Sequence, residues 1–450
     1  MTRKFDLVAI GTGSAASAVT SRCRAAGWQV AIVDSRPFGG TCALRGCDPK
    51  KVLVGAADAL DWIRRMKGNG IQAEKLRVDW QELMRFKRSF TEPVPKNREE
   101  GFAKAGIAAF HGRARFVGPS TVQVGDEVLE ARYVVVAAGQ KPADLEIPGT
   151  EHLTTSEQFL ELDELPKRML FIGGGYIAFE FAHVAVRAGA QVTVVHRGAR
   201  PLPHFDPDLV DQIVKSTREL GVDVQLGTEV VGVEKGPGQL IVRASASGQE
   251  RTFEADMVVH AEGRVPEIDD LNLDAAGVEW NKRGVTVNEF LQSVSNPAVY
   301  AAGDAAVSGG PPLTPVASYD GITVAANLLK GNHQKPNYLG IPTVVFTIPP
   351  LAAVGLGESE ARKQALKFWV KKEMTSNWYS SRRVGEKYSG FKVLVEEGTD
   401  RILGAHLLGG QAEEVINLFA VAMRSGMRAA DLKHMLFAYP THGSDVPYML

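Results

Sequence analysis

The sequence predicts an α/β fold with two similar βαβ units and a C-terminal α+β segment. Between residues 5 and 33 the chain reads as an apolar strand, a glycine turn, a helix and a second apolar strand. The same order returns at 168–195, and from 341 onward the chain has strands and a helix of its own. Two copies of one βαβ unit indicate two mostly parallel sheets, each of the kind that binds a nucleotide.

Each element of the first unit follows from its local pattern. Phe5 to Ile10 is a short apolar run, Gly11 to Gly13 interrupt it, and small residues suited to a helix occupy Ser14 to Ala26. Gln29 to Val33 is again apolar. The stretch Thr121 to Val136 alternates apolar and polar residues around turn signals, which predicts a β-meander on the edge of this domain.

The second unit and the C-terminal segment are interpreted in the same way. MLFI before Gly173 and QVTVV before His196 are predicted strands, with a helix through Val186 between them. Strands TVVFTI, FKVLVEE and ILGAHLL and a helix from Ala412 to Ser425 form the α+β segment. Changes in composition place boundaries near Gly149 and Pro266. We therefore expect four segments: 1–148, 149–266, 267–336 and 337–450.

Composition excludes several classes of protein. With 51 Lys and Arg against 52 Asp and Glu, the net charge of −1 gives no reason to expect nucleic acid or a membrane surface as partner. Three cysteines in 450 residues are too few for a disulfide-stapled secreted protein. No apolar run is long enough to span a bilayer, and the N-terminus enters a strand at once instead of a signal peptide. We expect a cytoplasmic protein.

Gly11-Thr12-Gly13-Ser14-Ala15-Ala16 has the G-x-G-x-x-[GA] form of a dinucleotide-binding loop. The glycines allow a tight turn and a close approach to a pyrophosphate, which would lie at the N-terminus of the following helix. Asp34 ends the second strand, 23 residues after Gly11, where a carboxylate can accept from a ribose hydroxyl. The alternative is an ordinary turn, which the surrounding strand, helix and acidic residue disfavour.

The second loop, Gly173-Gly174-Gly175-Tyr176-Ile177-Ala178, has the same context. Here the residue 23 positions after the first glycine is His196, and Arg197 and Arg200 follow it. Cationic side chains favour the 2′-phosphate of NADPH over the free hydroxyl of NADH. The alternative is that His196 and Arg197 are only a solvated strand end.

Cys42 and Cys47 lie in GGTCALRGCDPKK, and no Cys follows them. Four intervening residues are unusual for a metal site, so the pair is interpreted as a redox disulfide. Residues five apart in a regular helix are about 7.5 Å apart along its axis, which is too far for a disulfide, so we expect a distortion that Gly46 can supply. Two buried free thiols are the alternative, and Cys23 is expected only to pack.

These motifs, together with AAGD at 301–304, LTPVA at 313–317 and IPTVVFTIPPLAAVGL at 341–356, resemble the class I flavin disulfide reductases. That family includes glutathione reductase, dihydrolipoamide dehydrogenase and mercuric reductase. The likeness runs in order along nearly the whole chain. It implies two Rossmann-like dinucleotide-binding domains, FAD on the first loop, a nicotinamide on the second, and a homodimer formed through the C-terminal dimerisation domain.

The resemblance also implies roles for single residues. Cys42 would be the interchange thiol and Cys47 the thiol beside the flavin, while Lys50 would pair with Glu180 and Tyr176 would gate the nicotinamide pocket. Asp304 would hold the ribityl chain of FAD. The positions expected to bind the two cofactors are Gly11, Gly13, Ser14, Ala15, Asp34, Gly40, Thr41, Lys50, Ala138, Gly139, Gly173, Gly175, Tyr176, Ile177, His196, Arg197, Arg264, Gly303, Asp304, Leu313, Thr314 and Ala317.

One departure from the family concerns its C-terminal His-Pro-Thr, in which the His acts with a Glu as acid–base. This chain has Tyr439 in place of the His and Ser444 in place of the Glu. A tyrosine, with a pKa near 10, is a poor acid–base at neutral pH. His442 and Asp445 could form a displaced dyad, the enzyme could reduce a disulfide without an acid, or its acceptor could be something other than a disulfide.

Other differences from members of this family bear on which class of acceptor the enzyme reduces. Ser21 and Ile322 stand where glutathione reductases carry arginines, and the chain lacks the terminal cysteine pair of mercuric reductases. We expect hydride to pass from NADPH through FAD to the Cys42–Cys47 disulfide, and from there to a small-molecule or protein disulfide. The alternative is a flavin reductase of metal ions, quinones or other electrophiles. A poorly catalytic redox sensor or complex subunit is disfavoured because both cysteines, Lys50 and Glu180 are present.

Overall fold

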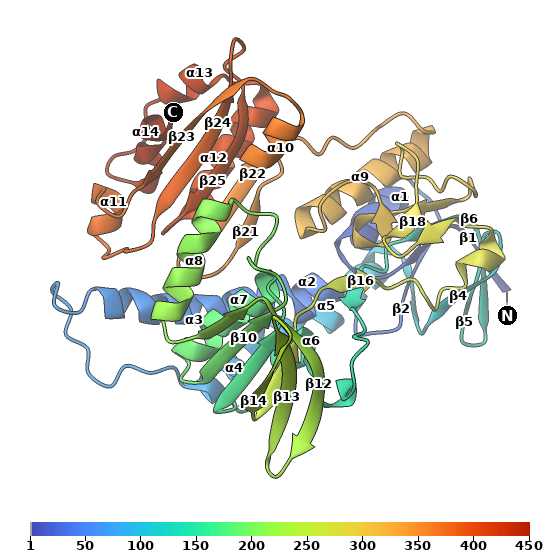
Figure 1. The fold of residues 1–450 in the computed structure, drawn as a ribbon. Coiled ribbons are helices and arrows are strands. Elements are labelled where there is room, and N and C mark those ends of the chain that lie inside the picture. The colour runs from blue at the N-terminus through green and yellow to red at the C-terminus, as the bar shows by residue number, and fades with distance from the viewer. Residues whose placement is uncertain (1) are drawn as a thin grey trace. The chain divides into compact units, whose positions relative to one another are not determined.

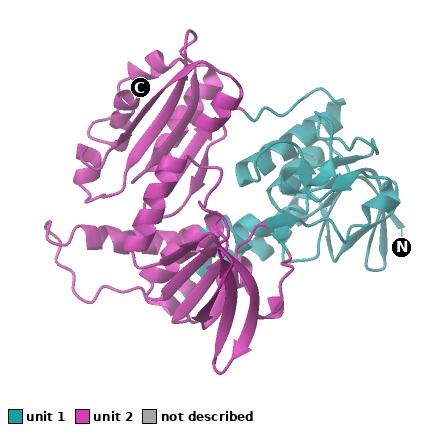
Figure 2. Cartoon of the chain, in the orientation of Figure 1, with its two compact units in different colours: residues 1–50, 85–143, 264–338 teal, residues 51–84, 144–263, 339–450 magenta. Residues whose placement is uncertain are grey.

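The computed structural model describes residues 2–450, which divide into two compact units (Figure 2). Unit 1 comprises Met1–Lys50, Arg85–Ala143 and Arg264–Tyr338, and unit 2 comprises Lys51–Met84, Asp144–Gly263 and Leu339–Leu450. Helices α3 (Cys47–Arg65) and α4 (Trp80–Thr91) each run from one unit into the other. No helix in the described part of the chain is long and apolar enough to cross a membrane.

The main sheet of unit 1 has the strand order β3-β2-β1-β6-β5-β4, with β19 paired to β6 (Figure 1). Its strands are β1 (Thr2–Ile10), β2 (Val30–Asp34), β3 (Ala108–His111), β4 (Ala114–Gly118), β5 (Thr121–Val124), β6 (Glu127–Val136) and β19 (Val299–Ala301). Strands β1, β2, β3, β6 and β19 are parallel, whereas β4, β5 and β6 form an antiparallel meander. Apolar runs on β1 and β2 are buried, as parallel strands require.

The α-helices that lie wholly within unit 1 are α1 (Ser14–Ala25), α2 (Gly40–Arg45), α5 (Val94–Ala105) and α9 (Thr314–Lys330). Of these, α1 packs on β1 and β2, α5 packs on β3, and α9 packs on α1. Helix α9 approaches α1 so closely that a Cβ atom at Gly321 would lie 2.4 Å from the carbonyl oxygen of Ala15. Short pairings complete the unit: β7 (Gln140–Pro142) with β16 (Arg264–Pro266), and β18 (Gly284–Thr286) with β17 (Trp280–Asn281) and β20 (Ala306–Val307).

Unit 2 contains a parallel sheet of order β11-β10-β9-β15-β8. Its strands are β8 (Thr154–Thr155), β9 (Arg168–Ile172), β10 (Gln191–His196), β11 (Asp223–Leu226) and β15 (Met257–His260). Helix α7 (Tyr176–Arg187) connects β9 to β10, and α8 (Pro207–Glu219) connects β10 to β11. Beside this sheet, an antiparallel sheet is formed by β12 (Thr228–Gly236), β13 (Gln239–Ala246) and β14 (Gln249–Ala255).

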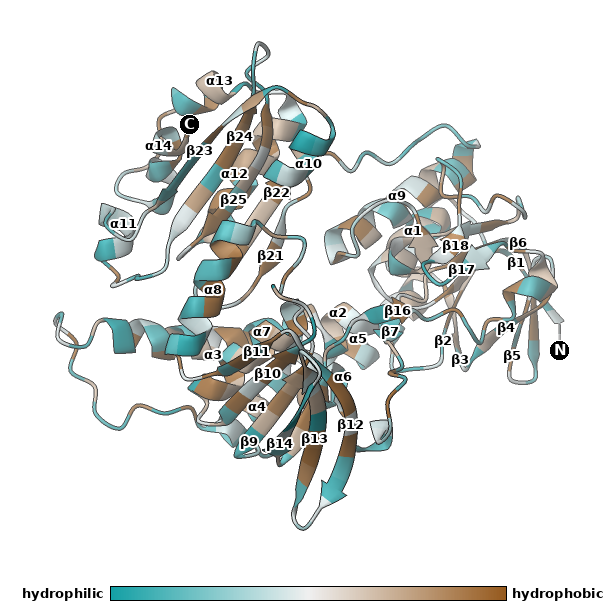
Figure 3. Ribbon diagram, in the orientation of Figure 1, coloured by the Kyte–Doolittle hydropathy of each residue, from teal (hydrophilic) through white to brown (hydrophobic). Residues whose placement is uncertain are grey.

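The C-terminal part of unit 2 is an antiparallel sheet of order β21-β22-β25-β24-β23. Its strands are β21 (Thr343–Val345), β22 (Leu351–Gly355), β23 (Phe368–Met374), β24 (Gly390–Glu396) and β25 (Ile402–Leu408). Helix α12 (Ala412–Ser425) packs on β22 and β25, and α10 (Glu358–Lys363), α11 (Tyr379–Arg382), α13 (Ala429–Lys433) and α14 (Val446–Met449) complete it. Apolar residues gather on β22, β24 and β25, whereas α10 is hydrophilic (Figure 3).

These elements confirm the predicted α/β fold class with its C-terminal α+β segment. One predicted strand was too long. TVVFTI at Thr343–Ile348 forms a strand only as far as Val345, because the next backbone N–H groups donate to side chains of α7. Phe346 N donates to Glu180 Oε1 at 2.8 Å, and Ile348 N donates to His183 Nδ1 at 3.0 Å.

Candidate functional site

The predicted site residues fall into both units. Unit 1 carries Gly11, Gly13, Ser14, Ala15, Asp34, Gly40, Thr41, Cys42, Cys47, Lys50, Ala138, Gly139, Arg264, Gly303, Asp304, Leu313, Thr314 and Ala317. Unit 2 carries Gly173, Gly175, Tyr176, Ile177, Glu180, His196, Arg197, Tyr439 and His442. Lys50 and Glu180 thus belong to different units, and their pairing stays a prediction.

In unit 1 the first glycine loop is shaped by close backbone approaches. Gly11 has a φ of +107°, and a Cβ atom there would lie 2.3 Å from the carbonyl oxygen of Ala137. Gly40 packs against Gly13, because a Cβ atom on Gly40 would lie 2.5 Å from the Cα atom of Gly13. Glycine is therefore required at Gly11 and Gly40 by backbone contacts that leave no room for a side chain.

The same loop leaves space where a dinucleotide is expected. A Cβ atom at Gly13 would meet nothing closer than 3.8 Å, and α1 begins at Ser14 with no side chain capping its N-terminal N–H groups. Asp34 Oδ2 accepts from the backbone N–H and the hydroxyl of Thr12 at 3.0 and 2.6 Å. These bonds fix the Asp34 carboxylate beside the loop. Together these features fit the pyrophosphate and ribose of FAD.

The segment around Asp304 is held by a carboxylate that the sequence analysis missed. Asp320 on α9 accepts from Gly303 N at 3.1 Å and from the Tyr338 hydroxyl at 2.8 Å. Burial raises the pKa of Asp320 to about 6, and burial likewise raises the pKa of Asp304, opposed by the charge of Arg264. The sequence signal was an acidic residue in the apolar helix TPVASYDGITVAANLL.

Cys42 and Cys47 lie on two helices that are separated at Gly46. Helix α2 ends at Arg45 and α3 begins at Cys47, because Gly46 has the non-helical dihedrals φ −144° and ψ −114°. A Cβ atom at Gly46 would lie 3.0 Å from the carbonyl oxygen of Thr41. The structure therefore shows the distortion that the five-residue spacing predicted.

Both cysteines are free thiols in this structure, Cys42 half-buried and Cys47 exposed. A hydrogen bond from Cys42 and a second from the Thr314 hydroxyl lower the pKa of Cys47 to about 6, with a further contribution from the charge of Lys50. The same hydrogen bond, burial and the negative charge of Cys47 raise the pKa of Cys42. The pair thus shares one proton: Cys42 is the thiol and Cys47 is the thiolate.

Two partners of these sulfurs were not found from the sequence. Thr314 begins α9 and places its hydroxyl 3.5 Å from Cys47 Sγ. Asp48, the second residue of α3, has its Oδ1 atom 3.9 Å from Cys42 Sγ. Cys23 is fully buried, and burial raises the pKa of its thiol to about 12. Its predicted role in packing fits these two observations.

The second glycine loop repeats the geometry of the first. Gly173 has a φ of +126°, and a Cβ atom there would lie 2.4 Å from the carbonyl oxygen of Ala261. A Cβ atom at Gly174 would lie 2.5 Å from the ring of His196, so the imidazole packs directly on the loop. At Gly175 the nearest atom would be 4.0 Å away, and Tyr176 beside it is 48% exposed. The open space at Gly175 fits the approach of a pyridine nucleotide.

The basic residues at the end of β10 have different partners. His196 Nε2 lies 3.3 Å from the carbonyl oxygen of Arg200, and burial lowers the pKa of His196. Arg200 forms an ion pair with Asp211, with Nε 2.9 Å from Oδ1. Arg197 is exposed, and no ion-pair partner for it occurs among residues 2–450. Arg197 is therefore the cation best able to meet a 2′-phosphate.

Helix α7, which follows the second glycine loop, buries three polar side chains. Glu180, His183 and Arg187 are fully or nearly fully buried. His183 Nδ1 accepts from Ile348 N, so its Nε2 carries the proton and donates to Thr217 Oγ1 at 2.9 Å. Burial and the charge of Arg187 lower the pKa of His183, so it is neutral.

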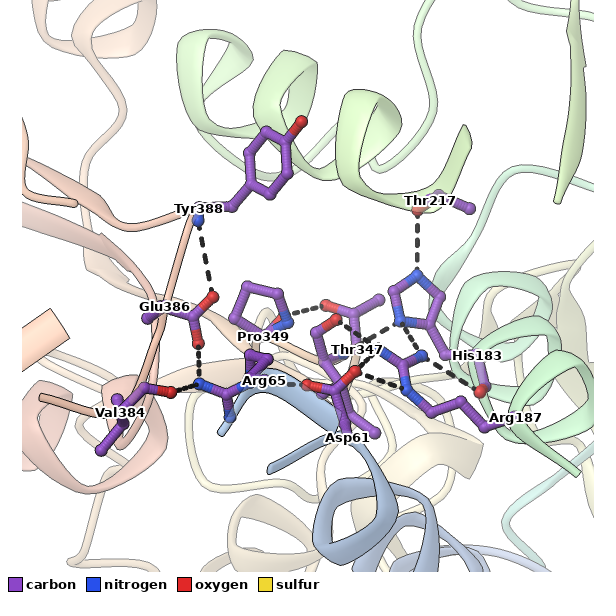
Figure 4. A network of polar contacts seen from close by, with 11 residues as sticks. Asp61, Arg65, His183, Arg187, Thr217, Thr347, Pro349, Val384, Glu386 and Tyr388 are labelled. Atoms are coloured by element: carbon purple, nitrogen blue, oxygen red, sulfur yellow. Dashed lines mark hydrogen bonds and ion pairs between the residues drawn. The ribbon is translucent and has the colours of Figure 1, made fainter. Parts of the chain in front are cut away.

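Arg187 and Arg65 complete this network around Asp61 (Figure 4). The Arg187 guanidinium donates to Asp61 Oδ1 at 2.8 and 3.1 Å and to the carbonyl oxygen of Ile348 at 3.1 Å. Arg65 donates to Asp61 Oδ2 at 2.8 Å and lies 3.4 Å from Glu386. The buried charges are thus paired, which offsets the cost of removing them from water.

The C-terminal residues that depart from the family pattern lie near a cavity of about 550 Å³, lined by His442 and by residues of α3 and α12. Tyr439 is 81% exposed. Burial lowers the pKa of His442 and raises that of Asp445, which accepts a hydrogen bond from Ser380. Within the described chain no hydrogen bond joins His442 to Asp445, and the displaced dyad stays a hypothesis.

Comparison with known proteins identifies the family. Residues 5–321 match the model of the pyridine nucleotide-disulphide oxidoreductases, and residues 341–449 match the dimerisation domain of that family. A glutathione reductase of Burkholderia cepacia is 31% identical over 97% of this chain and 96% of its own. A mercuric reductase of Staphylococcus aureus is 33% identical over 97% of this chain and 80% of its own.

A solved structure covers the whole length. The HOCl-induced flavoprotein disulfide reductase RclA from Escherichia coli, in its Cu(II) complex, matches with a TM-score of 0.89 and 26% identity over 99% of each chain. The expected resemblance to the flavin disulfide reductases is thereby confirmed. The chain belongs to the pyridine nucleotide-disulphide oxidoreductase family, enzymes that use FAD and a pyridine nucleotide.

Proposed function

We propose that this enzyme uses NADPH and FAD to reduce the Cys42–Cys47 disulfide, and that the resulting dithiol reduces a small-molecule or protein disulfide. The observation that carries this proposal is the polarised thiol pair, in which Cys47 is a thiolate with a pKa of about 6 and Cys42 keeps the proton. A thiolate is the reactive form of cysteine in disulfide exchange. Bound FAD would supply the two-electron chemistry that connects the nicotinamide to the disulfide.

The chain supplies the binding sites and the charge distribution for this chemistry. In the proposal, the loop of Gly11 and Gly13 and the residues around Asp304 hold FAD, and the loop of Gly173 and Gly175 holds the nucleotide. Arg197 favours NADPH because its guanidinium is exposed and no ion pair engages it in the described chain. Thr314 and Lys50 stabilise the Cys47 thiolate.

The proposed assembly is a cytoplasmic homodimer formed through the C-terminal dimerisation domain. Leu436, Tyr439 and Tyr448 are strongly exposed apolar or aromatic residues of this domain, and a second copy could cover them. Tyr439 stands where the family carries its histidine. A phenol there replaces the imidazole that serves the family as acid–base, so that role falls to another residue.

A second candidate function follows from the same substitution at Tyr439. An enzyme without the family acid–base could pass electrons to a metal ion or a quinone instead of a disulfide. Two related proteins have names that point to metals, the mercuric reductase and the RclA structure in its Cu(II) complex. The two candidates differ in whether turnover requires both cysteines.

NADPH oxidation by the FAD-loaded enzyme, with an aliphatic disulfide, a Cu(II) salt and a quinone as acceptors, separates these functions. We expect disulfide reduction by the wild type and its loss in Cys42→Ser and Cys47→Ser. Cys23→Ser is the matched control, because this buried thiol lies outside the proposed site, and it should keep full turnover. Disulfide turnover that survives in Cys42→Ser would refute the proposal, and wild-type turnover with only metal ions or quinones would establish the second function.

A further inference from the structure

Asp48 is the one carboxylate in direct contact with the Cys42–Cys47 pair in the described chain. It follows Cys47 as the second residue of α3, and its Oδ1 atom lies 3.9 Å from Cys42 Sγ, within the range of a thiol donor. Asp48 is exposed to solvent. It therefore touches the thiol that, in the proposed function, meets the acceptor.

The charged and polar groups around the two sulfurs are unequally distributed. Cys47 faces the Thr314 hydroxyl and the charge of Lys50, both of which favour its thiolate, whereas the charge of Asp48 disfavours it. Cys42 faces the Cys47 thiolate and the Asp48 carboxylate, both of which disfavour a negative charge on Cys42, while the Thr314 hydroxyl favours it. The Asp48 carboxylate, in contact with Cys42 Sγ, is placed to receive the proton that Cys42 carries.

We infer that Asp48 is a catalytic residue that takes the proton of Cys42 during attack on the acceptor and returns it to the leaving thiolate. This inference rests on the proposed disulfide reductase function. Asp48 would thereby act within the same chain in the role that the family gives to the histidine replaced by Tyr439.

In the proposed reaction, the acceptor disulfide is reduced by the Cys42–Cys47 pair. Cys42 Sγ attacks an acceptor RSSR′, its S–H proton moves to the Asp48 carboxylate, and a Cys42–SR bond forms as the S–S bond of the acceptor breaks. R′S⁻ leaves with the electron pair and takes the proton from Asp48. The Cys47 thiolate then attacks Cys42 Sγ, which forms the Cys42–Cys47 disulfide and releases RS⁻, and RS⁻ takes a proton from water. The dithiol loses two electrons and RSSR′ gains them.

A purely structural role for Asp48 makes a different prediction. A carboxylate in the first turn of a helix stabilises that helix by interacting with its unpaired N–H groups. Loss of such a role would lower stability but would not depend on the leaving group of the acceptor. Proton transfer by Asp48 should matter most for an acceptor whose leaving thiolate is basic, because that thiolate needs a proton to leave.

The first test compares Asp48→Asn with the wild type on two acceptors. With 2-hydroxyethyl disulfide, whose leaving thiolate is basic, we expect kcat/KM to fall by roughly a hundredfold, the lower end of what acid–base catalysis contributes. With 5,5′-dithiobis(2-nitrobenzoate), whose leaving thiolate is stable, it should change by less than about threefold. Glu82→Gln, which removes an exposed carboxylate from the first turn of α4, is the matched control and should leave the ratio of the two rates unchanged.

The second test does not depend on the acceptor. The chemically reduced enzyme is alkylated with iodoacetamide between pH 5 and pH 10, and modification of Cys42 is followed by mass spectrometry. Removing a like charge about 4 Å away should lower the pH midpoint of Cys42 alkylation in Asp48→Asn by roughly half a unit or more. Glu82→Gln should leave the midpoint in place.

The outcomes distinguish the two proposals. If Asp48→Asn changes neither the ratio of rates nor the alkylation midpoint while the wild type reduces both disulfides, Asp48 has no catalytic role and the proposed function stands. If the wild type reduces neither disulfide, the proposed function fails, and the inferred role of Asp48 in disulfide exchange fails with it.

Discussion

The two glycine loops share one backbone design but differ in the side chains around them. Gly11 and Gly173 both have a positive φ, and each lies against the carbonyl oxygen of the residue that follows a neighbouring strand, Ala137 after β6 and Ala261 after β15. The helices that follow differ. Helix α1 buries small or apolar residues against α9, whereas α7 buries Glu180, His183 and Arg187. In the proposed function, the shared loop backbone holds a dinucleotide, and the side chains that differ determine which dinucleotide each loop takes.

The ends of the second strands show the same contrast. Asp34 accepts hydrogen bonds from the first loop itself. His196 instead covers Gly174 with its ring, and Arg197 beside it remains exposed. A carboxylate at one strand end and cations at the other favour a free ribose hydroxyl and a 2′-phosphate, respectively. This difference carries the proposed division between FAD and NADPH.

The largest effect on stability is expected at the buried charged residues of α7, which α1 lacks. Arg187→Met removes one partner of a buried ion pair whose side chains are 3% and 17% exposed, and should lower the free energy of unfolding by about 3 kcal/mol. Arg200→Gln is the control, because its pair with Asp211 is half exposed and should contribute less than about 1 kcal/mol. Denaturant unfolding measures both. Equal losses would mean that the buried network of α7 is not a stabilising feature.

A smaller effect on stability tests the shared loop geometry. Gly173→Ala would place a Cβ atom 2.4 Å from a backbone oxygen at positive φ and should cost roughly 2 kcal/mol or more. In Gly175→Ala the new Cβ atom would have no neighbour closer than 4.0 Å, so the free energy of unfolding should change by less than about 1 kcal/mol. The KM for the nucleotide should rise, because the Cβ atom takes up space beside the loop. Thermal unfolding and steady-state kinetics report these two effects. A stable Gly173→Ala variant would contradict the described loop.

The preference for NADPH over NADH tests the difference between the two strand ends. Arg197→Gln should lower kcat/KM for NADPH by about tenfold and leave that for NADH nearly unchanged, since it removes a charge-assisted contact to the 2′-phosphate. Arg200→Gln should have a smaller effect because Asp211 already engages Arg200. Initial rates with both nucleotides decide this. An equal fall in kcat/KM with NADPH and with NADH would show that Arg197 does not bind the 2′-phosphate.

The smallest expected effect concerns the thiolate. Thr314→Val removes the hydroxyl that donates to Cys47, and the pKa of Cys47 should rise from about 6 by roughly one unit. Since the thiolate exists above the pKa, alkylation of Cys47 should then require a higher pH. Thr314→Ser keeps the donor and should keep the wild-type midpoint. An unchanged midpoint in Thr314→Val would show that Thr314 does not stabilise the Cys47 thiolate.

Local patterns in the sequence predicted the parts of the site that depend on neighbouring residues. Both glycine loops, the break at Gly46 and the helix from Ala412 to Ser425 follow from turn chemistry and apolar periodicity. Contacts between distant residues could not be predicted in this way. Thr314 reaches Cys47 across 267 positions, and Phe346 donates to Glu180 across 166.

Two further differences have the same origin. The strand predicted at Thr343–Ile348 ends at Val345 because its next N–H groups bond to α7, which no pattern within the strand reveals. Asp48 is adjacent to Cys47 in sequence, but its contact is with Cys42, on the other side of the break at Gly46. This contact depends on how α2 and α3 meet at Gly46, which the sequence pattern does not give.

The central claim is that Cys47 is the thiolate that stands beside the flavin when the enzyme holds two electrons. An anaerobic titration of the FAD-loaded enzyme with NADPH tests it most directly. We predict a long-wavelength thiolate–flavin charge-transfer band in the wild type, present above pH 6 and lost as the pH falls below it, because the pKa of Cys47 is about 6. The band should be absent from Cys47→Ser and present in Cys42→Ser. A wild type without the band, or a Cys47→Ser variant that keeps it, would contradict the account.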